Sequence, residues 1–175
     1  MRDRRIGESV TGTIVAGLLL VGLVIGPPSL ALADFNKRSD PGAQTDPQYA
    51  EGEKAVKRGD YATAIRLLEA VVARDERSAD AYNLLAYSIR RSGDAARAIP
   101  LYEKALAIDP KHRGAHEYIG EAYLILGDLP RAKEHLAALD KLCFLPCEEY
   151  TDLKKAVQQY EASQGRIKPA SKATP

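Results

Sequence analysis

Two cysteines, Cys143 and Cys147, have the most distinctive chemistry in this chain. They stand four residues apart in the run Cys-Phe-Leu-Pro-Cys. In an oxidising compartment two thiols this close favour a disulfide. An unbroken helix would hold their Cβ atoms too far apart for that bond, and Pro146 permits the chain break that brings them together. The favoured interpretation is a structural disulfide. Free buried thiols and a redox or Cu(I) site are the alternatives, although the spacing is not the two-residue spacing of redox motifs.

Three histidines are the other possible metal ligands. His112 and His116 stand one helical turn apart, a spacing that can bind a metal ion. No third ligand is evident, His116 holds a bulky packing position, and His112 precedes its predicted helix. His135 is isolated in the sequence and is predicted to lie on a helix surface. We therefore expect core and linker roles for these histidines, with no metal and no cofactor.

Other catalytic patterns are absent from the sequence. There is no nucleophile elbow, no glycine-rich phosphate loop and no His-Glu-x-x-His motif. Charged residues fall mostly on predicted helix faces, where solvation explains them. The sequence predicts a protein that is not an enzyme.

The elements that position these residues are set by three Gly-Asp pairs at a constant spacing of 34 residues. They are Gly59-Asp60, Gly93-Asp94 and Gly127-Asp128. A glycine can adopt the left-handed conformation that ends one helix, and the following aspartate can accept hydrogen bonds from the free N–H groups of the next helix. Each pair therefore predicts a helix-turn-helix corner.

Further positions repeat in the same register. Small residues recur five residues after and seven residues before each glycine, where they let paired helices approach closely; they are Ala64, Ala98, Ala132, Gly52, Ala86 and Gly120. Larger apolar residues recur between them, and Asp109-Pro110 closes the middle repeat. In these positions the chain resembles the tetratricopeptide repeat family over 45–146. The Cys pair before Glu148-Glu149-Tyr150 also resembles small exported bacterial members of that family, which assigns no activity.

The resemblance implies an all-α fold, a right-handed superhelical solenoid of three helical hairpins. The repeats are predicted at 45–78, 79–112 and 113–146. An amphipathic segment at 147–165 is predicted to be a capping helix that covers the apolar end of the stack. The polar segment 34–45 is predicted to be a flexible leader, and 166–175 a disordered tail.

The first 33 residues are predicted to be a secretory signal peptide. Arginines are followed by an apolar run at 13–25, two prolines and Ala31-Leu32-Ala33, which predicts cleavage after Ala33. The run is short for a membrane span. We expect a periplasmic or secreted protein without a membrane span after cleavage, and the alternative is an anchored protein that faces the periplasm.

The charge balance gives no indication that this protein has a strongly basic or acidic binding surface. Removing 1–33 takes three arginines and two acidic residues from totals of 25 and 24, which leaves 22 of each. A neutral mature chain gives no indication of nucleic-acid binding. The added final helix argues for a monomer.

The resemblance also implies a partner-binding groove, lined by fixed positions of the first helix of each repeat. The residues at these positions here are Tyr49, Glu53, Lys57, Asn83, Tyr87, Arg90, Arg91, Glu117, Glu121 and Leu124. Tyrosine and arginine are the residue types that carry much of the binding energy in such surfaces. Family members that bind the C-terminal carboxylate of heat-shock chaperones use a Lys/Asn/Arg clamp, and the matching positions here hold Tyr49, Glu53, Leu84, Gly114 and Tyr118. That ligand class is therefore not expected.

Taken together, the sequence predicts an exported or periplasmic adaptor or scaffold that binds a protein or peptide partner in its concave groove. The alternative function is a thiol- or copper-handling accessory factor in envelope assembly, in which Cys143 and Cys147 are the working groups.

Overall fold

The computed structural model describes residues 46–163, and helices joined by turns are the regular secondary structure of this part of the chain. Its helices are α2 (Pro47–Lys57), α3 (Tyr61–Arg74), α4 (Ala79–Arg91), α5 (Ala95–Ile108), α6 (Arg113–Leu126), α7 (Leu129–Leu142) and α8 (Glu148–Ala162). The predicted signal peptide at 1–33, leader at 34–45 and tail at 166–175 lie outside the described residues.

The three Gly-Asp corners form as the sequence predicts. Gly59, Gly93 and Gly127 have φ values of 74°, 104° and 85°, a conformation that favours glycine. The aspartate that follows each glycine caps the next helix, because its carboxylate accepts a hydrogen bond from the backbone N–H three residues later.

The first helix of each pair begins at a different kind of cap. Asp46 accepts hydrogen bonds from the N–H groups of Gln48 and Tyr49 and precedes Pro47 at the start of α2. Ser78 caps α4, and the His112 imidazole Nδ1 caps α6 by accepting from the N–H of Ala115 at 3.1 Å. The start of each of these first helices therefore also has a local cause in the sequence.

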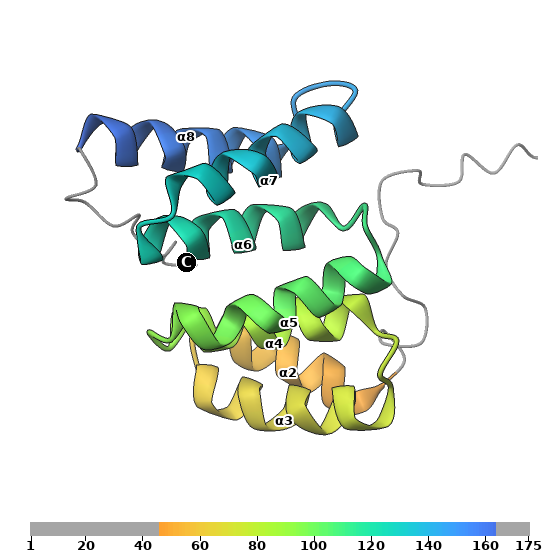
Figure 1. Cartoon of the computed structure of the whole chain (residues 1–175). Coiled ribbons are helices and arrows are strands. Elements are labelled where there is room, and N and C mark those ends of the chain that lie inside the picture. Colours follow the sequence, from red (N-terminus) through yellow and green to blue (C-terminus); the bar gives the residue numbers. More distant parts are fainter. Residues whose placement is uncertain (1–45, 164–175) are drawn as a thin grey trace, which may run out of the picture. The chain divides into compact units, whose positions relative to one another are not determined.

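The helices stack in chain order (Figure 1), each packing against its neighbours in the sequence, and α8 lies at the end opposite α2 and α3. The core lies between the packed helices. Its larger side chains are almost fully buried: Leu68, Val71, Leu85, Ile89, Tyr102, Ile119, Leu139 and Leu153. Pro100 lies inside α5, which nevertheless continues to Ile108. These described residues form an all-α solenoid.

Two of the repeated small positions meet different neighbours. A Cβ added to Gly52 would lie 3.0 Å from Leu68 Cγ, in the paired helix α3, as expected for a hairpin contact. A Cβ added to Gly120 would lie 2.6 Å from a methyl carbon of Leu153 in α8. The absence of a side chain at Gly120 therefore lets α8 pack closely against α6.

The last helix, α8, covers the end of the stack. It packs against both α6 and α7, and it buries Leu153, Ala156 and Val157. Among the described residues, no helix combines the length and apolar content needed to cross a bilayer.

Candidate functional site

The ten residues predicted to line the groove lie on α2, α4 and α6, the first helix of each pair. The structure leaves Lys57 exposed, and Glu53, Asn83 and Arg91 partly exposed. The other residues of this set are buried: Tyr49, Tyr87, Arg90, Glu117, Glu121 and Leu124. We call these ten residues the inner-helix face. Much of it is thus interior, and its role in partner binding stays a prediction.

A buried ion pair joins two repeats at the centre of the inner-helix face. The Arg90 Nη1 atom lies 2.8 Å from Glu121 Oε2, and the two side chains are 3% and 11% exposed. Arg90 Nε also donates to the Tyr102 hydroxyl, at 3.3 Å. Removing one member of such a pair would leave a buried charge without its partner, so these residues hold α4, α5 and α6 together.

Aromatic rings surround the Arg90 guanidinium. Its central carbon lies 5.4 Å from the centroid of Tyr87 and 5.5 Å from that of Tyr118, and the two rings are 4.9 Å apart. Cation–π attraction of this kind strengthens when water is excluded. Burial also raises the pKa values of Tyr102 and Tyr118 above the usual value, so both phenols stay protonated at neutral pH.

Arg91 and Asn83 differ from Arg90, because each has a side-chain atom without a hydrogen-bond partner. Arg91 donates from Nη1 to the Tyr87 hydroxyl at 2.7 Å and lies over the Tyr61 ring at 5.1 Å. Its Nε atom, and the Oδ1 atom of Asn83, are buried without a hydrogen-bond partner. A buried polar atom left unpaired is costly, and such atoms are few in native structures. Both residues lie on α4 and are partly exposed, although these two atoms themselves are buried.

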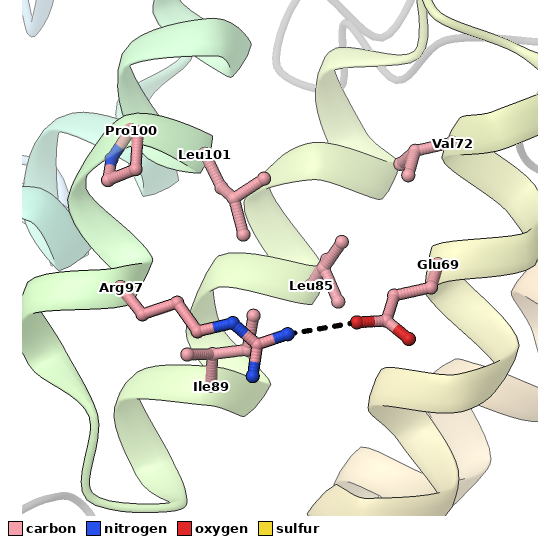
Figure 2. A pocket seen from close by; sticks show the side chains of 7 residues that line it. All are labelled: Glu69, Val72, Leu85, Ile89, Arg97, Pro100 and Leu101. Atoms are coloured by element: carbon pink, nitrogen blue, oxygen red, sulfur yellow. Dashed lines mark hydrogen bonds and ion pairs between the residues drawn. The ribbon is translucent and has the colours of Figure 1, made fainter.

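A separate apolar pocket lies between α3, α4 and α5, and the sequence did not predict it. Its volume is about 360 Å³, and it is lined by Glu69, Val72, Leu85, Ile89, Arg97, Pro100 and Leu101. Figure 2 shows the Arg97–Glu69 ion pair, at 3.0 Å, spanning one side of it. Leu85 and Ile89 come from α4, and Pro100 comes from α5. No sequence signal indicated that the three would share a pocket.

The cysteine pair closes a small loop between α7 and α8. Cys143 and Cys147 form a disulfide with an S–S distance of 2.07 Å, and their Cα atoms are 5.8 Å apart. Cys143 follows the end of α7 and Cys147 precedes the start of α8. The bond therefore restrains the junction between α7 and α8. Within the loop, Phe144 and Leu145 are strongly exposed.

The histidines are arranged differently from the expectation. His135 was predicted to be isolated on a helix surface, and this is wrong: its Nδ1 lies 3.0 Å from His116 Nδ1, and it stacks on Tyr123. The contact joins α6 to α7 across 19 residues, which helical spacing within one segment cannot show. His112 pairs with Asp80, at 3.0 Å, in addition to capping α6. Within 46–163, no group of three or more His, Cys, Asp or Glu residues is placed to hold a metal ion.

Comparison with solved structures finds the same fold in several proteins. The TPR domain of Sgt2 from Aspergillus fumigatus superposes with a TM-score of 0.63 at 20% identity, covering 74% of this chain and 85% of that chain. The Yersinia enterocolitica type III secretion chaperone SycD, in complex with a peptide of the translocator YopD, gives 0.58 at 21% identity, with coverages of 67% and 89%. The first TPR of Spaghetti (RPAP3), bound to the HSP90 peptide SRMEEVD, gives 0.58 at 24% identity, with coverages of 65% and 90%. At these identities the likeness establishes the fold.

Comparison with family models identifies the repeat. One tetratricopeptide repeat model matches 49–113, and a second matches 90–142. Together they span more than half of the chain. Comparison with curated proteins finds no match. The repeated Gly-Asp corners, the stacked helical hairpins and both family matches agree, and the chain belongs to the tetratricopeptide repeat family.

Proposed function

We propose that this protein is a non-enzymatic adaptor or scaffold, monomeric on its own, that binds a protein or peptide partner through the inner-helix face. Membership of the tetratricopeptide repeat family supports the proposal, because stacked helical repeats build extended binding surfaces. Structures of the same fold also hold peptides, those of YopD and HSP90. The clamp positions for a chaperone carboxylate hold other residues here, so the proposed ligand class is different.

The observation that carries the proposal is the pair of unsatisfied atoms on α4. Asn83 Oδ1 can only accept a hydrogen bond, and Arg91 Nε can only donate one. Both side chains are partly exposed, so a small rotation of either can bring its unpaired atom to the surface, where the N–H or C=O of a peptide backbone can satisfy it. Lys57, exposed at the end of α2, and the partly exposed Glu53 add one charge of each sign to the inner-helix face. We therefore propose a mixed polar ligand whose main chain pairs with Asn83 and Arg91.

The test is capture of the partner from envelope extracts with the Asn83→Ala/Arg91→Gln variant. Loss of two hydrogen bonds, one of them charge-assisted, is expected to weaken capture at least tenfold, at about 1.4 kcal/mol per factor of ten. The matched control is Arg66→Gln, an exposed arginine on α3. Equal capture by the double variant and the control would remove the inner-helix face from the proposal. Arg90 is unsuitable for this test because it is buried in an ion pair.

We also propose that the protein works outside the cytoplasm. The order of arginines, apolar run and Ala31-Leu32-Ala33 supports export with cleavage after Ala33. N-terminal sequencing of the cell-envelope form tests this: a mature chain that begins at Asp34 is expected. A chain that keeps its first residues would indicate the membrane-anchored alternative.

Copper binding requires Cys143 and Cys147 as free thiolates, and thiol exchange requires the pair to cycle between the dithiol and the disulfide. Their disulfide in the structure favours the structural role at the α7–α8 junction instead. We therefore retain the adaptor function alone.

A further inference from the structure

The contact between His116 and His135 has features of a metal-ligand pair. The two Nδ1 atoms face each other at 3.0 Å, from α6 and α7. The other ring nitrogen of His116, Nε2, lies 3.1 Å from the backbone carbonyl oxygen of Pro110. A histidine that ligates a metal commonly donates its second N–H to a carbonyl in this way.

These distances determine where the ring protons lie. The Pro110 carbonyl can only accept, so His116 Nε2 must carry a proton. In neutral His116 the Nδ1 atom then presents a lone pair, and His135 Nδ1–H donates to it. A single proton thus lies between two nitrogens that can both bind a metal.

We propose that His116 and His135 form a binding site for one Cu(II) ion, held between their Nδ1 atoms. With metal–nitrogen bonds of about 2.0 Å, a nitrogen separation of 3.0 Å corresponds to an N–metal–N angle of about 97°. That angle suits neighbouring ligands in a square-planar or tetragonal Cu(II) site. Tetrahedral Zn(II) would need the nitrogens about 0.3 Å further apart. Cu(II) also forms the strongest complexes among the divalent first-row ions.

The surroundings of the pair allow an ion to enter. Both histidines are only partly buried, so solvent can supply the remaining ligands. Arg131 lies over the Tyr123 ring, on which His135 stacks, at 4.7 Å from its centroid. Its charge is paired with Asp128 at 2.6 Å.

A change of tautomer can free the His135 Nδ1 lone pair without changing the charge of either histidine. Burial lowers the pKa of His135 to about 4 and also lowers that of His116, so both rings are neutral at pH 7. A metal about 2.0 Å from both Nδ1 atoms lies about 1.3 Å to one side of the line that joins them, so both rings turn toward it, and the His135 proton moves from Nδ1 to Nε2. Each histidine then offers one lone pair to the ion and keeps one N–H.

The test is titration of the untagged full chain with CuSO₄ at pH 7, followed by calorimetry and by the electron paramagnetic resonance spectrum. One bound Cu(II) is expected, with hyperfine splitting from two nitrogens. His116→Gln and His135→Gln should each weaken binding at least tenfold, and ZnCl₂ should bind more weakly than Cu(II). The cysteines do not compete, because the disulfide holds both.

His112→Gln is the matched control, since it removes the third histidine of the chain and leaves the pair. It should keep the copper site and its two-nitrogen spectrum. Circular dichroism of each variant establishes that the helices persist. A wild-type chain that binds no Cu(II) at 100 μM, or equal binding by wild type and the His116→Gln/His135→Gln double variant, would overturn the proposal.

Discussion

Arg90 and Glu121 show how single residues on the inner-helix face serve the fold. They come from successive repeats and form an ion pair that is almost completely buried. Their positions in the repeat predicted a groove lining, and the sequence could not show that they face each other. Arg90 therefore stabilises the fold of this face. Asn83 and Arg91 each keep a buried side-chain atom that has no hydrogen-bond partner.

Replacing Glu121 with Ala is expected to lower the free energy of unfolding by about 3–5 kcal/mol, because it leaves the Arg90 charge buried. The control is Glu69→Ala, which removes an exposed partner of Arg97 and should change stability by no more than about 1 kcal/mol. Urea unfolding at pH 7 measures both. Equal effects of the two substitutions would contradict the structural role given to the buried pair.

Stability should fall on mild acidification because of His135. Its folded pKa is lowered to about 4 from the ordinary 6.5, mainly by burial. Between these values the unfolded chain binds a proton that the folded chain does not, so acidification favours unfolding, and above pH 6.5 the effect is absent. Urea unfolding from pH 7 to pH 4.5, with chelator present, should show a shallower decline for His135→Gln than for wild type. An unchanged slope would contradict the burial of this imidazole.

At the scale of helices, the predictable part was the corner between paired helices. A Gly-Asp pair contains both the left-handed residue and the cap, so the turn can be predicted from two neighbouring letters. Contacts between helices were harder to predict from the sequence. Gly120 was expected to allow contact within its own hairpin, but its nearest neighbour is Leu153 of α8.

Gly120→Ala is expected to destabilise the protein by about 1–3 kcal/mol, because the new Cβ would lie 2.6 Å from a buried Leu153 methyl carbon. Gly114→Ala is the control in the same helix. Its Cβ would have ordinary contacts at 3.5 Å, so it should be neutral or stabilising by up to about 1 kcal/mol. Thermal unfolding of both variants compares them. A harmless Gly120→Ala would mean that α8 does not dock closely on α6.

The disulfide is expected to stabilise the α7–α8 junction modestly. In the chain-entropy model a loop this short contributes about 2 kcal/mol. Cys143→Ser/Cys147→Ser should lose about that amount while α8 stays helical, since Leu153, Ala156 and Val157 remain to hold it. Urea unfolding and far-ultraviolet circular dichroism provide the readouts. Complete loss of folding in the variant would show that the bond does more than restrain one junction.

For the whole molecule, a period of 34 residues made the architecture readable from the sequence. The Gly-Asp corners and the small residues repeat at the same spacing, so both predict the same helix ends. The candidate site was less predictable, because repeat position says which helix face a residue occupies and not what meets it there. The His116–His135 contact, the Arg90–Glu121 pair and the pocket beside Pro100 all depend on side chains from different helices.

The claim that a partner binds the inner-helix face is tested most directly by photocrosslinking in living cells. A photoreactive amino acid replaces Lys57, which is exposed on that face, or Arg66, which is exposed on α3. Neither replacement disturbs a buried contact. We predict a discrete crosslinked species from position 57 that is absent from position 66. No crosslink from position 57, or the same species in equal amount from both positions, would contradict the account.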